Sequence, residues 1–282
     1  MTSYPTIRQN PIFSLFLASY FLIACQPKPI SEVETEAEPF YLKVAAYNVE
    51  YSKNASAEQI GEAFKPFDFD VVAFSEAPGG DWTKRVAAAM DMEHVVVGKY
   101  STAGHDDKYK TIASKTPLFG YEEIWMADTL HTVTKATTKI GDMEVEIHAV
   151  HFPFGWRDQA HIDETTNKIQ TYIDHVRNLS TEAVAVLMGD FNFIPSNTDS
   201  VNNYHELFME IGFDLHWMDL GIDTRKVNTF NALVPEDEGN GDVIDHIMYA
   251  SEKAKAVDGG ILELEKPLSD HKPVWALLEI KN

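Results

Sequence analysis

The chain has 282 residues, which is enough for one large domain or two small ones. Hydrophobic residues make up 44% and charged residues 24% of it, which excludes a disordered chain, a collagen and a multi-span membrane protein. With 23 Lys and Arg against 44 Asp and Glu, the formal net charge is −21, and a polyanion of this size repels nucleic acid at long range. The charge argues against a general DNA-coating protein but allows a local basic cleft.

The first 24 residues have the pattern of an export signal. Arg8 is their one charged residue, and residues 12–24 are all apolar or small. This run is too short to span a bilayer, which takes about 20 residues, but it suits the apolar core of a signal peptide. It ends in Leu22-Ile23-Ala24-Cys25, which resembles the lipobox of bacterial lipoproteins, in which the cysteine becomes the lipidated first residue. The alternative is a buried apolar strand with a chance cysteine.

Cys25 is the only cysteine, so an intramolecular disulfide is excluded. Residues 26–39 are rich in proline and glutamate, and such a segment stays extended. We therefore expect a lipoprotein signal peptide over 1–24, an acidic tether over 25–39 and a folded domain over 40–282. The lipid would hold an exported, acidic protein at a bacterial membrane. Gln26, rather than an aspartate, is compatible with the periplasmic or surface side of an outer membrane in a Gram-negative source.

The folded part alternates strand-like and helix-like segments. Runs rich in β-branched and aromatic residues occur at 42–49, 70–75, 94–98, 143–151, 183–189, 243–249 and 273–280. Four helix signals lie between them: a capping box at Ser56–Gln59, a cap at Asp81 for 82–90, an apolar face over 158–179, and a start at Ser196 or Asn197 with a stop at Gly212. Because strands outnumber helices in an irregular order, we predict two layers of mixed sheet with helices outside.

Polar side chains follow several of the predicted strands where the chain leaves the core. They are Asn48 and Glu50, Glu76, Asp190 and Asn192, with Asp245 inside a late strand and Asp270 and His271 just before the last one. Residues two apart in extended chain point to the same side, as Asp190 and Asn192 would. Amide and carboxylate oxygens suit a hard cation such as Mg²⁺, and His151 and His271 can exchange a proton near neutral pH. Each residue alone is more often structural, but their joint occurrence predicts one site.

The order of these motifs resembles the endonuclease/exonuclease/phosphatase superfamily, which includes deoxyribonuclease I, abasic-site endonucleases, bacterial sphingomyelinases and inositol polyphosphate 5-phosphatases. The matching segments are 47–50, 74–76, 112–118, 148–151, 189–192, 244–247 and 269–274. The resemblance implies an α+β fold, a four-layer α/β/β/α sandwich with two mixed β-sheets and the site at one edge between them. Two features depart from the family pattern: Ser75 stands where a glutamine is common, and residues 108–111 lack the usual glycine.

The same resemblance implies a role for each polar residue in hydrolysis of a phosphate ester. Glu76 and Asn48 would hold a divalent metal, with Asp270 near or on it and Glu50 a weaker candidate. The metal would be Mg²⁺, with Mn²⁺ or Ca²⁺ as alternatives. His271, paired with Asp245, would be the base or a phosphate-orienting cation, and Asp190 would position or deprotonate the water. Asn192 would donate to the phosphate, and His151 would contact a phosphate oxygen or protonate the leaving group.

The substrate stays open between three functions. The first is a phosphodiesterase or phosphatase for a small-molecule or lipid-headgroup phosphate, bound to the membrane through its N-terminal lipid and with no obligate protein partner. The second is an extracellular or periplasmic endonuclease or exonuclease. The third is a non-catalytic surface binding module, which predicts missing catalytic groups. A nuclease would need a basic track, for which the candidates are Lys84, Arg85, Lys99, Lys108, Lys110, Lys115, Arg157, Arg225 and Lys226.

Overall fold

The computed structural model describes residues 39–154, 159–177, 184–195, 204–239 and 242–281. The predicted signal peptide, the lipidation site Cys25 and nearly all of the tether lie outside the described residues, as do Arg157, Ser196 and Asn197. Among the helices of these described ranges, none is long and apolar enough to cross a membrane.

The first sheet has six strands in the order β11-β12-β1-β2-β4-β3. Their bounds are Ala254–Ile261 (β11), Val274–Ile280 (β12), Phe40–Asn48 (β1), Val71–Ala77 (β2), Tyr109–Ser114 (β4) and His94–Val97 (β3). β1 and β2 are parallel, and the other neighbouring pairs are antiparallel. The carboxyl ends of β1 and β2 therefore meet at one edge of this sheet.

The second sheet repeats this plan with six strands in the order β5-β6-β7-β8-β10-β9. Their bounds are Phe119–Trp125 (β5), Thr132–Ile140 (β6), Met143–His151 (β7), Val184–Asp190 (β8), Asp245–Ala250 (β10) and Phe213–Leu215 (β9). Here β7 and β8 are the parallel pair, and the other neighbours are antiparallel. Each sheet therefore brings two carboxyl ends together near its middle.

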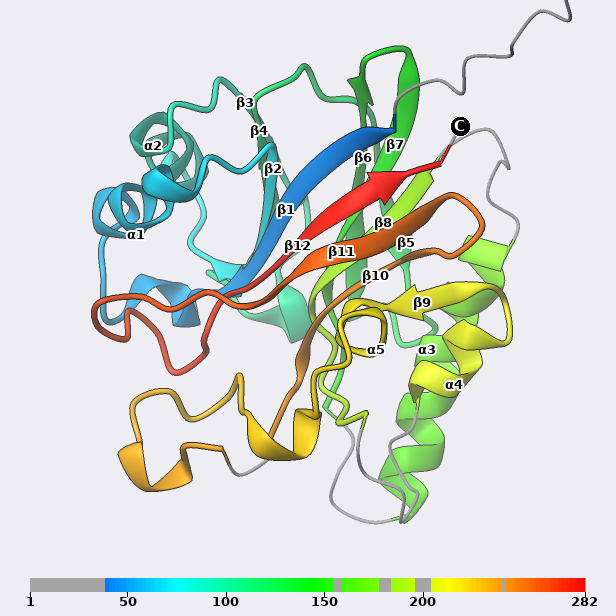
Figure 1. Ribbon diagram of the computed structural model, residues 1–282. Helices are drawn as coiled ribbons and strands as arrows, with labels where there is room; N and C mark the ends of the chain where they lie inside the picture. The colour runs from blue at the N-terminus through cyan, green and yellow to red at the C-terminus, as the bar shows by residue number, and fades with distance from the viewer. Residues whose placement is uncertain (1–38, 155–158, 178–183, 196–203, 240–241, 282) are drawn as a thin grey trace, which may run out of the picture. The chain divides into compact units, whose positions relative to one another are not determined.

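Helices cover the outer face of each sheet (Figure 1). The capping box at Ser56 and Gln59 starts α1 (Ala57–Phe64), which packs with α2 (Trp82–Ala89) on the first sheet. α3 (Gln159–Arg177) and α4 (Tyr204–Met209) lie outside the second sheet, and α5 (His216–Asp219) follows β9. Short 3-10 helices occupy Glu50–Ser52, Lys65–Phe67, Thr102–Gly104, Thr224–Lys226 and Pro235–Asp237.

The apolar residues of β1 show how the layers form. Leu42, Val44 and Ala46 face the second sheet in one buried cluster, whereas Ala45 and Tyr47 face α1 and α2 in another. This alternation buries both faces of the strand, which is what a central strand of a four-layer fold requires. The α+β class, the two mixed sheets and the four-layer α/β/β/α sandwich are confirmed.

Two local predictions need correction. Asp81 precedes α2, but its side chain makes no capping hydrogen bond there. The predicted strand at 243–249 begins two residues later, at Asp245, because Ile244 and Asp245 donate their backbone N–H groups to the hydroxyl of Thr229 rather than continuing a ladder.

Candidate active site

The parallel strand pairs place the predicted site residues in register. Asn48 ends β1 opposite Ser75 of β2, and Glu76 follows Ser75. His151 ends β7 opposite Asp190, the last residue of β8, and Asp190 also pairs with Asp245 of β10. The strands of both sheets thus deliver their terminal polar side chains to one edge of the sandwich.

The chain turns sharply immediately after these strands. Asp190 Oδ1 accepts the backbone N–H of Asn192 at 3.0 Å, and Asn48 Oδ1 accepts that of Glu50 at 3.1 Å. Glu50, Glu76 and Asn192 have φ values of 43°, 49° and 52°, in the left-handed region that non-glycine residues seldom adopt. The expected extended chain from Asp190 to Asn192 is therefore wrong, and the chain from Asn48 to Glu50 is not extended either. Backbone strain of this kind clusters at functional sites.

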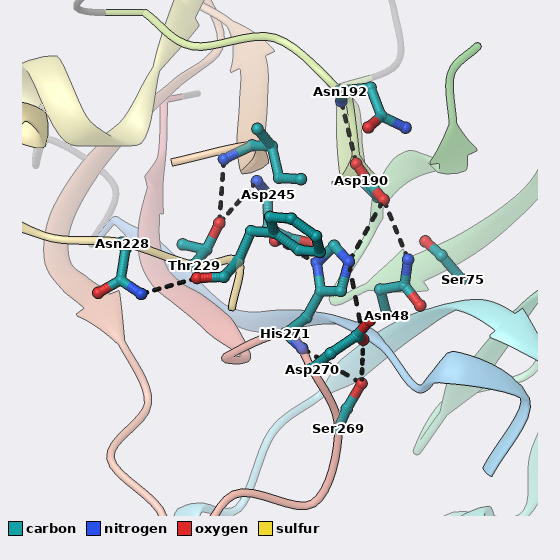
Figure 2. Close-up of polar contacts among 12 residues, drawn as sticks. Asn48, Ser75, Asp190, Asn192, Asn228, Thr229, Asp245, Ser269, Asp270 and His271 are labelled. Atoms are coloured by element: carbon teal, nitrogen blue, oxygen red, sulfur yellow. Dashed lines mark hydrogen bonds and ion pairs between the residues drawn. The ribbon is translucent and has the colours of Figure 1, made fainter. Parts of the chain in front are cut away.

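Asp190 joins the two sheets at the centre of the site (Figure 2). Asn48 Nδ2 donates to Asp190 Oδ2 at 3.0 Å, and His271 Nε2 lies 3.8 Å from the same oxygen. The other nitrogen of His271, Nδ1, donates to Asp245 Oδ2 at 2.8 Å. Asp190, Asp245 and His271 are all buried, so these charges interact in a low local dielectric.

The electrostatics of this trio make His271 a cation and Asp190 a potential base. Burial alone would lower the pKa of His271. The negative charges of Asp245, Asp190 and Asp270 have a larger, opposite effect and raise this pKa to about 10. Burial raises the pKa of Asp190 to about 7, with Asp245 also raising it and His271, Asn48 and Asn192 lowering it. At neutral pH His271 is therefore an imidazolium, and Asp190 can take up a proton.

His151 connects the trio to Glu76. Its Nε2 lies 3.7 Å from Asp190 Oδ2 and 3.7 Å from Glu76 Oε1. Burial, followed by the nearby charges of Lys110 and Lys108, holds the pKa of His151 well below its usual range. Asn192 Nδ2 donates to the backbone oxygen of Phe152 at 2.9 Å, which fixes the turn after β8 against the end of β7.

The predicted metal ligands lie on the first-sheet side of this edge. Glu76 Oε2 contacts Lys108 Nζ at 2.6 Å, and both carboxylate oxygens of Glu50 accept hydrogen bonds, from Lys53 and Asn54 at 2.8 Å each. Asp270 Oδ1 accepts from Ser269 Oγ at 3.1 Å. Burial raises the pKa of Asp270, and the charges of Glu50 and Glu76 raise it too, against the opposing effect of His271.

This repulsion among carboxylates, together with the oxygen-rich donor set, fits a hard divalent cation. However, the tightest group is a different one. Asp190, Asp245 and His271 form the single set of three metal-ligand side chains in the described ranges whose ligand atoms all lie within 4.8 Å of one another. Because Asp190 and Asp245 hold His271 as a cation, we interpret this trio as a set of ion pairs rather than as a metal site. The metal site that we propose consists of the ligands predicted from the sequence.

With this geometry established, comparison with known proteins decides the family. A model of the Endonuclease/Exonuclease/phosphatase family matches residues 45–271. The chain belongs to the endonuclease/exonuclease/phosphatase family. Its members are hydrolases that act on phosphoesters. A comparison with curated proteins gives no match.

Solved structures agree on the fold of this family member. An endonuclease/exonuclease/phosphatase from Beutenbergia cavernae DSM 12333 is similar at a TM-score of 0.69 and 18% identity, covering 86% of this chain and 72% of that one. TDP2 of D. rerio, complexed with single-strand DNA product, gives 0.66 and 12%, covering 85% and 99%. A family protein from Bacteroides thetaiotaomicron gives 0.63 and 17%, covering 87% and 100%. At such identities the likeness shows the fold alone.

The segment before β10, which contains Asn228, Thr229 and Phe230, supports the site, although the sequence patterns did not identify it. Thr229 Oγ1 accepts the backbone N–H groups of Ile244 and Asp245 at 3.0 and 3.1 Å, and the Phe230 ring centroid lies 5.2 Å from that of His271. Asn228 Nδ2 donates to the backbone oxygen of Phe230 at 2.7 Å (Figure 2). The available signal was the pair Asn228-Thr229, whose side chains bond readily to the backbone, in a stretch without strand periodicity.

Among the described basic residues that could belong to a nucleic-acid track, several are already paired with acidic side chains. Most contact a carboxylate: Arg85 contacts Glu58, Lys108 contacts Glu76, Lys115 contacts Asp68, and Arg225 and Lys226 both contact Asp223. Lys110 is buried. Because these cations are paired, they add little to a long-range positive field, so they give little support to binding along an extended polyanion.

Proposed function

We propose that this family member is a divalent-metal-dependent phosphoester hydrolase of the phosphodiesterase or phosphatase type. One observation carries the proposal: Asp190 stands between the imidazoles of His151 and His271, at 3.7 and 3.8 Å, and is held there by Asn48 from the other sheet. A carboxylate that accepts a proton near neutral pH, next to a fixed cation, can activate water beside a bound phosphoryl group. Every side chain needed for this chemistry is present, which argues against a non-catalytic binding module.

In this proposal, one residue activates the attacking water and the others bind the phosphate. Asp190 takes the proton of the attacking water, because its pKa of about 7 lies near the operating pH. His271, kept as an imidazolium by Asp245, stabilises negative charge on the phosphoryl oxygens. Asn192 and His151 donate hydrogen bonds to the phosphate from the ends of β8 and β7.

Glu76 and Asn48, with Asp270 beside them and Glu50 as a weaker candidate, are the residues we propose for the metal. The oxygen donors favour Mg²⁺, with Mn²⁺ or Ca²⁺ as alternatives. When bound, such an ion polarises a phosphoryl oxygen and offsets the charge of the phosphate. The carboxylates of Glu50, Glu76 and Asp270, which repel one another, would gain most from its presence.

Hydrolysis of bis-p-nitrophenyl phosphate and of p-nitrophenyl phosphate tests the proposal. We expect release of nitrophenol with Mg²⁺ and loss of turnover with EDTA. Asp190→Ala and His271→Ala should each lower kcat by at least ~100-fold, the scale of a lost general base or charge stabiliser. Asp91→Ala is the matched control, because Asp91 is an exposed carboxylate paired with Lys65 outside the site. Near-wild-type turnover of Asp190→Ala, or turnover in EDTA, contradicts the mechanism.

A nuclease is the alternative within the same chemistry. It draws support from one fold neighbour whose structure is a complex with single-strand DNA product, and the paired basic residues weigh against it. Plasmid nicking measured at rising salt separates the two, because contacts to the phosphate backbone weaken steeply with salt. Absence of nicking at low salt would leave the small-substrate hydrolase.

We propose further that Cys25 carries a lipid that holds the exported protein at a bacterial membrane, on the periplasmic or surface side of the outer membrane in a Gram-negative source. The apolar run before Cys25 and the acidic segment after it support this. Metabolic labelling with a fatty acid should mark the wild type but not Cys25→Ala, and the variant should leave the membrane fraction. Equal labelling of both proteins would contradict the anchor.

A further inference from the structure

A hollow of about 180 Å³ opens beside the candidate active site. Its lining includes Glu76, His151 and Asn192 of the candidate site, and it also includes Lys108, His131 and Phe154. A phosphate bound at His151 and Asn192 would therefore place its ester group in this space. The volume suits one six-membered ring, since a cavity of ~150 Å³ holds benzene.

Lys108 is the cation of this hollow. Its Nζ lies 2.6 Å from Glu76 Oε2 and 5.3 Å from the Tyr51 ring centroid, and its side chain is 20% exposed. An ammonium has three donors, and this contact with Glu76 uses one of them. Lys108 thus keeps donor capacity on the side that lines the hollow.

A second lysine strengthens the positive potential there. Lys110 is fully buried and donates to the backbone oxygen of Tyr100 at 3.0 Å and to Thr102 Oγ1 at 3.4 Å. Lys108 and Lys110 both act electrostatically on His151, so their charges reach the catalytic end of the hollow. In a chain with a formal net charge of −21, two lysines this close to the candidate site are a selective feature.

His131 and Phe154 give the hollow its neutral contacts. Asp128 Oδ2 accepts from His131 Nδ1 at 2.6 Å, and Asp128 also accepts the backbone N–H of His131. With Nδ1 committed as a donor, Nε2 of the neutral ring is a hydrogen-bond acceptor suited to a hydroxyl. Phe154 is 46% exposed and offers an aromatic face for a ring.

We propose, resting on the hydrolase function above, that Lys108 and this hollow form a subsite for a second oxyanion on a ring-sized ester group of the substrate. The scissile phosphate would lie at His151 and Asn192, and a phosphate or carboxylate on the attached ring would meet Lys108. The substrate class is thus a phosphorylated ring compound with at least two negatively charged groups, rather than a neutral alcohol ester.

Binding of non-hydrolysable phosphonates tests the subsite without relying on turnover. The probes are phenylphosphonate, 3-carboxyphenylphosphonate and benzene-1,3-diphosphonate, measured by calorimetry on the full chain with Mg²⁺ present. Wild type should bind one or both of the doubly substituted probes about tenfold or more tightly than phenylphosphonate, as a charge-assisted hydrogen bond provides. The two probes distinguish a carboxylate from a phosphate as the preferred oxyanion.

Three variants assign the preference to Lys108. Lys108→Met should reduce it to under about threefold, and Lys108→Arg should retain most of it by keeping the charge. Lys99→Met is the matched control, because the Lys99 ammonium lies over the ring of Tyr100, outside the hollow, and the preference should persist. Equal affinity of wild type for all three probes, or an unchanged preference in Lys108→Met, overturns the subsite. If nitrophenyl esters are still hydrolysed in that case, the hydrolase proposal survives; if they are not, both proposals fail.

Discussion

The charge of His271 is the feature that a single substitution can test most directly. Its Nδ1 donates to Asp245 Oδ2 at 2.8 Å, and Asp245 Oδ1 is a buried atom with no hydrogen-bond partner within the described part of the chain. The carboxylate is therefore committed to His271. Because an adjacent opposite charge favours the ionised imidazole, Asp245 is a major reason why the pKa of His271 is raised.

Asp245→Asn should lower the pKa of His271 by about two units, the usual effect of removing a close opposite charge. A folded-state pKa of about 10, above the ordinary 6.5, stabilises the fold fully below pH 6.5 and loses that contribution as pH rises through 10. In the variant this loss should still begin near pH 6.5, but it should be smaller and be complete at lower pH. An NMR titration of the imidazole nitrogens measures the shift.

The matched control for this titration is Asp91→Asn, which neutralises an exposed carboxylate paired with Lys65. It should leave the titration of His271 unchanged. If His271 in Asp245→Asn titrates as in wild type, then Asp190 and Asp270 alone hold its charge, and the paired arrangement with Asp245 has no electrostatic role.

At the same scale, sequence reasoning could name the polar residues but not their local geometry. Asn48, Asp190 and Asp245 lie at the ends of apolar strands, where a polar residue is easily recognised in the sequence. The turns that bring Asp190 Oδ1 to the N–H of Asn192 depend on a left-handed φ at a non-glycine residue, which no spacing rule predicts. Lys108 and Thr229 act through contacts distant in sequence, so their partners emerge only in the folded chain.

At the scale of elements, the close approach of β7 and β8 positions the site. Gly189, the residue before Asp190, has a φ of 144°, and a Cβ there would lie 2.1 Å from the backbone oxygen of Val150. Only a residue without a side chain lets these parallel strands pair at this point. The glycine therefore sets the distance between His151 and Asp190.

Gly189→Ala should lower the free energy of unfolding by more than about 3 kcal/mol, because backbone strain and a collision with main-chain atoms add together. Gly212→Ala is the control: it shares a positive φ, 86°, but a Cβ there would meet nothing within 4 Å. That variant should lose only about 1–2 kcal/mol. Urea denaturation of both measures the difference, and equal losses would show that β7 and β8 can separate without cost.

Sequence patterns predicted the central strands and also the edge strand β3, but they missed β4, β5, β6, β9 and β11. β1, β2 and β8 read as largely apolar runs, whereas β7 alternates apolar residues with Glu144, Glu146 and His148. β5 is largely exposed, and β11 carries two glycines. Strands of this kind depend on their neighbours in the sheet more than on their own residues, which is why periodicity could not find them.

At the scale of the whole molecule, buried histidines link stability to pH. His148, His216 and His246 are fully buried, and burial lowers the pKa of each, that of His216 to about 3. The unfolded chain binds a proton at each near pH 6.5, whereas burial opposes this protonation in the folded chain. Stability from these groups is therefore complete above pH 6.5 and is lost as pH falls below it.

His246 shows why the folded state resists protonation. Its Nδ1 accepts the indole N–H of Trp217 at 2.9 Å, and its Nε2 donates to the backbone oxygen of Phe193 at 2.9 Å. A proton on Nδ1 would face the Trp217 donor, and the hydrogen bond would be lost. This links acid sensitivity to the active site, because Phe193 follows the turn that carries Asn192.

We expect the free energy of unfolding to fall by about 3 kcal/mol between pH 7.5 and 5.5 from His216 and His246, at ~1.4 kcal/mol each, with a smaller loss from His148. Relief of repulsion in a chain of net charge −21 opposes part of this loss, so a variant isolates the histidine contribution. In His216→Phe the difference between the two pH values should be about 1.4 kcal/mol smaller than in wild type. Urea denaturation at both pH values measures it, with His105→Gln as a control at an exposed position. If His216→Phe keeps the wild-type pH dependence while His105→Gln alters it, acid sensitivity arises at the surface and the buried imidazoles play no part in it.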